Sequence, residues 1–445
     1  MSKKYFLMGT FILSGAGFLS RLIGFFYRIF LSHTLGASGV GIFQLTVPLQ
    51  TLLLALCAGG TQTAISHFCA SKNAKKDTIS AKDYFFAGTL FSLLISVILS
   101  CLLYTNADFA AQVLLQEPRT KELVALLALS LPFSVFHTCI NSYYFARKET
   151  LFPSVLQLLE QAVRVLSSYG IYFYLSSKKL TFTPGCVGLS TFFSEIVVSC
   201  VSFIAVKIYF SKNSLSLFPV TKFAKKLQKL LYFACPLTLN RILLTLLGSI
   251  EVTLIPKYLL HSGMTDTQAL SVYGILSGMT LPLILFPSTF TNSAAVMLMP
   301  SVTELRTLKD QKRIRYVIKN TYQSILLMGT FFTILFFFFG NFIGNLLFHN
   351  PTVGIYLKTL SFVCPFLYLN TALSSILNGL DKQGKCLLFN VLSICTRIFF
   401  VVIMIPKLGI NGYLYGIILS EFVKTFFYSC ILLKDHYLLF DIDNH

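Results

Sequence analysis

Long apolar runs constrain this chain more than any other feature of its sequence. Segments of about 20 or more mostly apolar residues recur along the 445 residues, and helices of about that length span the ~30 Å hydrocarbon core of a bilayer. Only 12% of the residues are charged and the mean hydropathy is +0.73, whereas soluble proteins keep roughly 25% charged residues. The sequence therefore predicts an all-α integral membrane protein with about twelve transmembrane helices, at 5–32, 40–70, 83–104, 122–146, 151–176, 184–210, 228–258, 267–300, 316–347, 352–379, 385–407 and 410–433.

The distribution of lysine and arginine predicts the orientation of these helices. Basic residues are concentrated in alternate connections, such as 72–82 and 306–319, and are sparse in the others. Because basic loops tend to stay in the cytoplasm, we expect both termini to be cytoplasmic, in a bacterial-type cytoplasmic (inner) membrane. Topology and attraction to the anionic phospholipid bilayer then account for the net charge of +19, so no nucleic acid partner is expected.

The longest cytoplasmic connection divides the chain into two sets of six helices. We expect an N-terminal lobe at 1–210, a linker at 211–227, a C-terminal lobe at 228–434 and a short cytoplasmic tail at 435–445. Since six is an even number, the halves run in the same direction, and parallel repeats predict alternating access with a site between the lobes. The features that recur in the same order are Pro132-Phe133 and Pro365-Phe366, Arg164 and Arg397, and Ser194-Glu195 and Ser420-Glu421.

Two arginines in the first apolar segment are the leading candidates for a binding site. Arg21 and Arg28 are seven residues apart, so they leave nearly the same face of a helix. Charges at membrane depth usually face a bundle interior or a wet cavity, so we expect an anion-binding site here, with Arg241 as a third member. Three alternatives remain: a structural pair of Arg21 with a glutamate, snorkelling of Arg28 to the interface, and pairing of Arg241 with Glu251 or Glu195.

Further polar residues in the apolar segments are candidates for a cavity or for ion coupling. Carboxylates at membrane depth can bind a proton or a cation, although pairing with the arginines is the simpler explanation. Glu160 and Arg164 are one turn apart, which is the spacing of a local ion pair. Prolines kink helices, and the predicted hinges are Pro48, Pro282 and Pro287. The cavity or coupling candidates are Glu160, Arg164, Glu195, Asn240, Glu251 and Arg397.

The sequence offers no pattern that is typical of a catalytic or cofactor site. It lacks a nucleotide-binding fingerprint, a metal-ligand spacing and a CxxC pair, and its eleven cysteines lie mostly in apolar runs. We therefore expect no enzyme activity, no metal and no cofactor. Transport would then be coupled to the membrane potential, Na⁺ or H⁺.

Several stretches resemble one family of membrane proteins. The opening SRLIGFFYRIFLSHTLGASGVGIFQLTVP is similar to the first-helix signature of the stage V sporulation protein B and polysaccharide export family. That family is related to MurJ-type lipid II flippases in the multidrug/oligosaccharidyl-lipid/polysaccharide superfamily. Further similar stretches cover both halves: AGGTQTAIS, PLTLNRILLTLLGSIEVTLIP, YGILSGMTLPLILFPSTF, ILNGLDKQGK and GINGYLYGIILSE.

The resemblance implies a MATE-like fold that flips a lipid-linked saccharide of peptidoglycan, cell-wall or polysaccharide synthesis, without ATP. The family's first-helix arginines correspond to Arg21 and Arg28. The chain departs from the lipid II flippases because LLLALCAGGTQTAIS and YGILSGMTLPLILFP contain no arginine and no residues match two further helices after the twelfth. The implied substrate is therefore an anionic polyprenyl-diphosphate sugar rather than lipid II in particular. We expect a monomer, which could associate with envelope-synthesis enzymes.

Three alternatives belong to other functional classes. A cation-coupled multidrug exporter of the MATE type would need acids in the first lobe, whereas the first segment carries two arginines and no acid. A scaffold of an envelope or sporulation complex would have no use for intramembrane charges. A membrane glycosyltransferase would need an acidic pair or a metal motif, which the sequence lacks.

Overall fold

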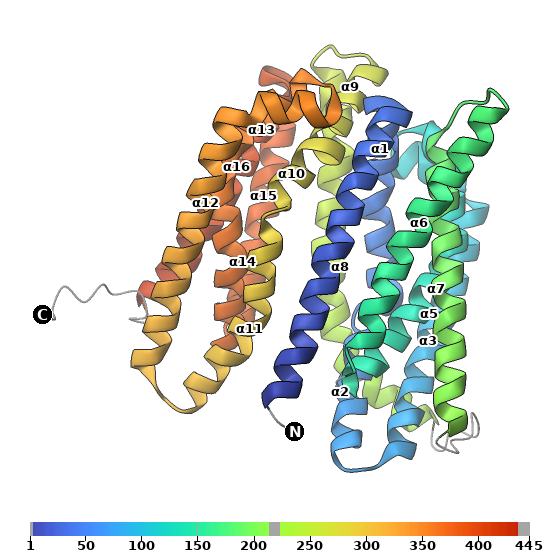
Figure 1. Cartoon of the computed structure of the whole chain (residues 1–445), viewed down its shortest axis with the longest axis vertical. Helices are drawn as coiled ribbons and strands as arrows, with labels where there is room; N and C mark the ends of the chain where they lie inside the picture. Colours follow the sequence, from blue (N-terminus) through green and yellow to red (C-terminus); the bar gives the residue numbers. More distant parts are fainter. Residues whose placement is uncertain (1–2, 148, 213–222, 435–445) are drawn as a thin grey trace, which may run out of the picture. The chain divides into compact units, whose positions relative to one another are not determined.

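The computed structural model describes residues 3–147, 149–212 and 223–434, and all of its regular secondary structure in these ranges is helical (Figure 1). The described chain forms two compact units, Met1–Ser249 and Ile250–His445. Helix α8 (Phe223–His261) contributes residues to both units. The predicted all-α class is therefore confirmed. Residues 213–222 of the predicted linker and the predicted tail at 435–445 lie outside the described residues, so the predicted lobe boundaries stay a prediction.

Ten helical segments of the described ranges are long and apolar enough to cross a membrane. The twelve predicted spans differ from them at two places. The first two predicted spans fall in one apolar segment, Gly15–Ala58, because α1 (Lys3–Ala58) runs through both with a break at Gly36. The fifth predicted span is α6 (Leu151–Ser177), which is amphipathic and carries Glu160 and Arg164 near its middle.

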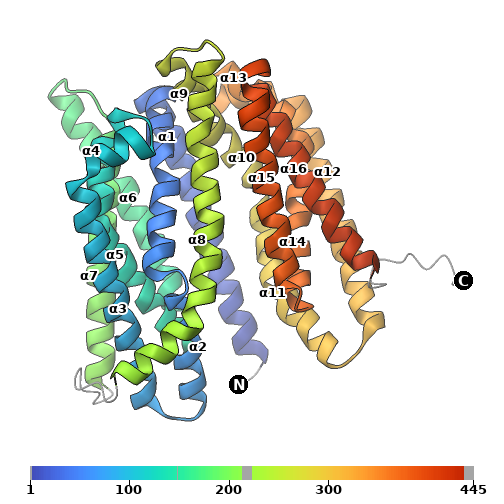
Figure 2. The same cartoon turned by 180° about the vertical axis from the view of Figure 1, so that it is seen from behind.

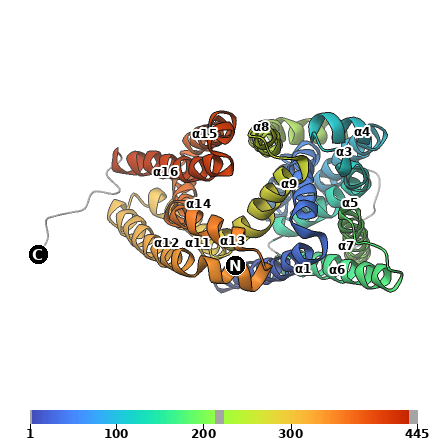
Figure 3. The same ribbon diagram turned by 90° about the horizontal axis from the view of Figure 1, so that it is seen from above.

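In the first unit, α5 (Lys121–Ala146) is the central helix. It packs against α1, α2 (Thr61–Ala74), α3 (Thr78–Thr105), the short α4 (Ala107–Phe109), α6 and α7 (Pro184–Lys212), and Figure 3 shows α1, α3, α5, α6 and α7 from above. Apolar side chains such as Val124, Leu131 and Val135 are buried along α5 and form part of the core of this unit.

Glycines break the N-terminal helices at two points. Gly36 has φ 69° and ψ 176°, a conformation that is essentially restricted to glycine. The second predicted span, 40–70, is not one helix, because α1 ends at Ala58 and α2 begins after Gly59 and Gly60 (Figure 2). A Cβ atom at Gly60 would lie 2.2 Å from the carbonyl oxygen of Ala234 on α8. Glycine is therefore required there for the close approach of two helices.

In the second unit, α14 (Cys364–Gly379) is the central helix and packs against α11, α12, α15 and α16. The predicted span 267–300 is divided into α9, a π-helical turn at Ile275–Thr280, α10 and α11, with Pro282 and Pro287 at the starts of the last two pieces. The remaining bounds are α9 (Asp266–Gly274), α10 (Leu281–Leu285), α11 (Ser288–Thr307), α12 (Gln311–Phe348), α13 (Pro351–Leu360), α15 (Gln383–Leu408) and α16 (Ile410–Lys434).

The two central helices are stabilised by the same kind of contact. A proline inside a helix removes the hydrogen bond to the carbonyl four residues earlier. For Pro132 that carbonyl belongs to Ala128, and it accepts a bond of 2.6 Å from the hydroxyl of Ser100 on α3. For Pro365, in the first turn of α14, it belongs to Ser361, which accepts a backbone bond from Cys364 and a bond of 2.9 Å from the hydroxyl of Thr333 on α12. The internal repeat suggested by the two Pro-Phe pairs thus extends to three-dimensional contacts.

The break at Gly36 leads to a stability prediction. We expect Gly36→Ala to lower the stability by about 1–3 kcal/mol, because alanine is strained in this backbone conformation. The matched control is Gly17→Ala in the same helix, where a Cβ atom has no heavy atom within 4 Å. The chain has no tryptophan, so thermal unfolding in detergent is followed with a thiol-reactive dye that reports exposure of buried cysteines such as Cys57 and Cys69. Equal midpoints for the two variants would contradict the prediction.

Candidate functional site

Helix α1 has two different faces: one is apolar and packs against other helices, and the other carries arginines. Its buried side includes Tyr27 and Phe30, and the Tyr27 hydroxyl is 2.6 Å from the hydroxyl of Ser168 on α6. Arg21 and Arg28 follow buried positions by one residue, so they turn about 100° away and are exposed. No ion pair or hydrogen bond joins Arg28 to another of the described residues. The structure thus places both predicted arginines on the part of α1 that its own unit leaves uncovered.

The third predicted arginine, Arg241, lies on α8 and is also exposed. With its amide oxygen turned toward α8, Gln62 of α2 accepts hydrogen bonds from both terminal nitrogens of Arg241, one of them 3.3 Å long from Nη2. The neighbouring Asn240 has a buried Oδ1 that lacks a partner among the described residues. Gln62 was missed by the sequence prediction, which singled out the segment AGGTQTAIS only for its resemblance.

A second polar cluster lies inside the first unit, between α5, α6 and α7. Glu195 of α7 is buried, and its Oε2 is 2.9 Å from Nε2 of His137 on α5. On α6, Arg164 and Glu160 form the local ion pair that their spacing predicts. Beside them is a cavity of about 170 Å³, whose polar lining residues are His137, Asn141, Gln157 and Glu160. His137 was not among the predicted site residues.

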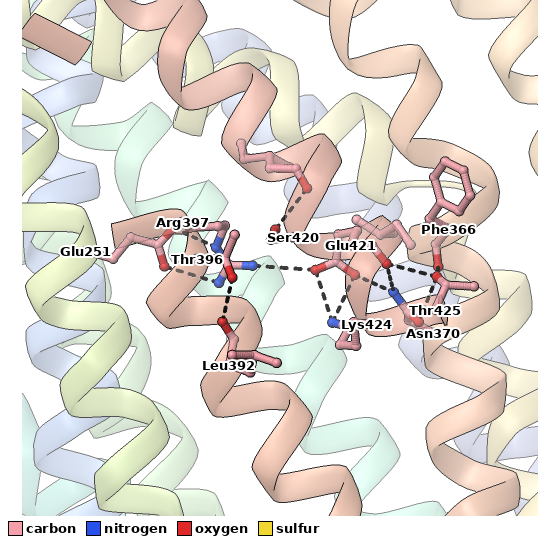
Figure 4. A network of polar contacts seen from close by, with 12 residues as sticks. Glu251, Phe366, Asn370, Leu392, Thr396, Arg397, Ser420, Glu421, Lys424 and Thr425 are labelled. Atoms are coloured by element: carbon pink, nitrogen blue, oxygen red, sulfur yellow. Dashed lines mark hydrogen bonds and ion pairs between the residues drawn. The ribbon is translucent and has the colours of Figure 1, made fainter. Parts of the chain in front are cut away.

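The second unit holds a longer network, which Figure 4 shows from close by. Arg397 of α15 binds Glu251 in a bidentate manner, at 2.7 Å from Nε and 3.1 Å from Nη2, and its Nη1 is 3.4 Å from Glu421 of α16. Lys424 approaches the Glu421 carboxylate to 2.9 Å. Tyr413 donates a bond of 2.7 Å to Glu251. Two carboxylates and two cations therefore alternate, and their formal charges cancel.

These contacts decide between the alternatives for several predicted residues. Arg241 is not paired with Glu251 or Glu195, because Glu251 binds Arg397 and Glu195 binds His137. The acids and arginines that were candidates for ion coupling form pairs in the structure, which is the simpler of the two explanations given above. Their roles in transport, and the hinge roles of Pro48, Pro282 and Pro287, stay predictions.

The two polar clusters occupy equivalent positions in the repeat. His137 and Asn370 each follow the Pro-Phe proline by five residues, and each bonds the glutamate of the Ser-Glu pair: Asn370 donates 2.8 Å to Oε2 of Glu421, as His137 contacts Glu195. The hydroxyl groups of Ser199 and Thr425, four residues after those glutamates, donate to the carbonyls of Phe133 and Phe366. The Pro-Phe spacing was the signal that could have identified His137.

Similarity to solved structures defines the class of protein. The structure matches a multidrug resistance MATE family transporter of the MOP superfamily in an inward-facing conformation with a TM-score of 0.72, at 15% identity over 94% of this chain and 96% of that one. A MOP superfamily transporter from Pyrococcus furiosus gives a TM-score of 0.64, at 16% identity over 97% and 96%. The protein is therefore a multi-pass membrane protein with a MATE-like fold.

The sequence identifies the family more closely. Residues 6–306 match the polysaccharide biosynthesis protein family, and the chain belongs to this family. Stage V sporulation protein B of Bacillus subtilis (strain 168) is 23% identical over 98% of this chain and 85% of its own length. Lipid II flippase MurJ of the same organism is 24% identical over 98% and 84%. The resemblance predicted from sequence motifs is confirmed.

The network of the second unit leads to a prediction. Arg397→Met leaves the buried carboxylate of Glu251 without its counter-ion, and we expect a loss of about 3–5 kcal/mol in the free energy of unfolding. The matched control is Arg306→Met, which breaks an ion pair with Asp381 whose side chains are 43% and 72% exposed. Exposed pairs contribute at most about 1 kcal/mol. Detergent unfolding curves test both variants, and Glu251→Gln added to Arg397→Met should restore part of the loss.

Proposed function

We propose that this protein is a transporter that moves an anionic polyprenyl-diphosphate-linked saccharide across the cytoplasmic membrane by alternating access. The observation that carries the proposal is the pair of exposed arginines, Arg21 and Arg28, on one face of a membrane-spanning helix. Membership of the polysaccharide biosynthesis protein family supports it. Similarity to a lipid II flippase over 98% of the chain supports a lipid-linked saccharide as the substrate class.

The physical task of such a transporter explains why arginines are useful. A diphosphate head group carries several negative charges and must cross ~30 Å of hydrocarbon while its lipid tail stays in the bilayer. Guanidinium groups replace part of its hydration shell through bidentate, charge-assisted hydrogen bonds. An inside-negative membrane potential assists outward movement of negative charge by about 2.3 kcal/mol per charge per 100 mV. No ATP site is required for this step.

The substrate class is proposed without singling out lipid II. Helix α2 carries no arginine, and its Gln62 instead holds the guanidinium of Arg241. The hydrogen bonds from Arg241 on α8 to Gln62 on α2 hold the guanidinium group of this third arginine in place. The proposal therefore assigns anion recognition to Arg21 and Arg28, with Arg241 as a contributor whose orientation depends on Gln62.

Further elements of the proposal concern topology and coupling. The protein works as a monomer with both termini in the cytoplasm, as the positive-inside rule predicts. It acts as a transporter and not as an enzyme, and envelope-synthesis enzymes supply its substrate.

A MATE-type exporter of organic cations is the second candidate, because the fold is shared with multidrug transporters. The cationic face of α1 disfavours it, since that face repels cations.

Removing the two arginines tests the function directly. In vesicles that contain the purified protein and a polyprenyl-diphosphate saccharide, we expect Arg21→Ala and Arg28→Ala each to slow flipping by about tenfold or more. A hydrogen bond to a charged group is worth about 1.5–3 kcal/mol, which corresponds to that factor. Flipping is measured as the rate at which the saccharide becomes accessible to a membrane-impermeant enzyme.

Two comparisons make this experiment specific. Arg21→Lys keeps the charge but loses the bidentate geometry, so its rate should lie between those of wild type and Arg21→Ala. Arg313→Ala at the start of α12, where the arginine side chain is 76% exposed, should leave the rate unchanged. Wild-type flipping by the double variant Arg21→Ala/Arg28→Ala would refute the assigned site. Transport of an organic cation, with no flipping of the saccharide, would favour the multidrug exporter.

A further inference from the structure

We propose that His137 is a proton-binding site that takes up a proton on Nδ1 from the cavity between α5, α6 and α7. His137 is only 9% exposed, and it lines this cavity of about 170 Å³. Its Nδ1 has no hydrogen-bond partner among the described residues, and neither does Oδ1 of Asn141 in the same lining. A volume of this size holds several water molecules, each of which occupies roughly 30 Å³ in the liquid.

The geometry fixes which nitrogen is available. Nε2 of His137 lies 2.9 Å from Oε2 of Glu195, so in the neutral ring the Nε2–H donates to that carboxylate. The lone pair of Nδ1 then has no hydrogen-bond partner among the described residues. A hydronium ion in the cavity gives up one O–H bond and becomes water, while a new Nδ1–H bond forms. The imidazolium keeps its bond to Glu195.

The charge balance of the cluster favours this protonation. The charged groups that act on the imidazole are Glu195 of α7 and Glu160 and Arg164 of α6. Helices α1, α2 and α3 also pack against α5. With neutral His137 the cluster has one uncompensated negative charge, which is costly at membrane depth. A proton on His137 neutralises it.

In the second unit a lysine supplies the positive charge that a protonated His137 would supply in the first unit. There Asn370, which cannot titrate, takes the position of His137, and Lys424 compensates Glu421 at 2.9 Å. Lys424 follows its glutamate by three residues. The residue at that position after Glu195 is Val198, which is uncharged and lines the cavity. Where the second unit has the ammonium group of Lys424, the first unit has the titratable imidazole of His137, which lines the cavity.

The inference deepens the proposed function, because it makes the proton the coupling ion, but protonation is measurable without any transport. The test is ¹⁵N NMR of the full-length protein, labelled at histidine and held in lipid nanodiscs, over about pH 5 to 8, where histidine changes charge. We expect one titrating signal to disappear in His137→Asn. That variant copies Asn370, so the hydrogen bond to Glu195 is kept. The pH of half-protonation should fall by about 1–3 units in Glu195→Gln, which removes the negative neighbour.

A third variant tests the comparison between the halves. Val198→Lys supplies the ammonium of the second unit, and we expect it to shift the His137 titration to lower pH in the same way. If this variant does not fold, Glu195→Gln and His137→Asn still decide. An unchanged set of titrating signals in His137→Asn, or an unshifted titration in Glu195→Gln, overturns the proposal. So does a His137 signal that stays neutral throughout while NaCl, compared with choline chloride, perturbs it, because that result assigns the cavity to sodium.

Transport measurements separate this inference from the proposed function. In the vesicle experiment we expect the flipping rate of the wild type to depend on pH and that of His137→Asn to be independent of it. A pH-independent wild-type rate overturns proton coupling and leaves the flippase proposal intact. Absence of flipping by the wild type, together with the expected NMR titration, overturns the flippase proposal and leaves the proton site intact.

Discussion

An ionised side chain inside a membrane is costly unless it is paired or hydrated, and this constraint organises the polar interior of the protein. In the second unit the cost is met completely by protein groups, since Arg397 and Lys424 compensate Glu251 and Glu421. In the first unit Arg164 pairs with Glu160, and His137 pairs with Glu195. On α1 the two arginines are exposed. Internal pairs stabilise the helices, and the proposed function assigns anion binding to the exposed arginines of α1.

The repeat explains how such charges are held in place. In each unit a proline of the central helix cannot donate to the carbonyl four residues earlier, and this carbonyl accepts a hydrogen bond from a hydroxyl of a neighbouring helix. The buried glutamate of each unit lies on another helix, and the side chain five residues after the proline binds it. The backbone contacts are thus the same in both halves, while the side chains at equivalent positions differ. The first unit has His137 and Val198 where the second has Asn370 and Lys424.

The sequence alone predicted much of the architecture. Apolar run length gave the helical membrane class, and the first-helix motif gave the family, which residues 6–306 confirm. The spacing of Glu160 and Arg164 predicted their ion pair, since both lie on one helix where periodicity fixes distance. The span at 40–70 was wrong as a single helix, because hydropathy does not register the close approach of α8 that requires Gly60.

What the tertiary structure decided was the partner of each charge. Periodicity places Arg21 and Arg28 on one face, but it does not show which face the neighbouring helices cover. Glu251 binds Arg397 across 146 positions of sequence, and Glu195 binds His137 across 58. Such contacts depend on how helices pack, and local spacing carries no information about them. The sequence by itself therefore determined a membrane protein with cations and acids at depth, and only packing decided which of them pair with one another and which side chains are exposed.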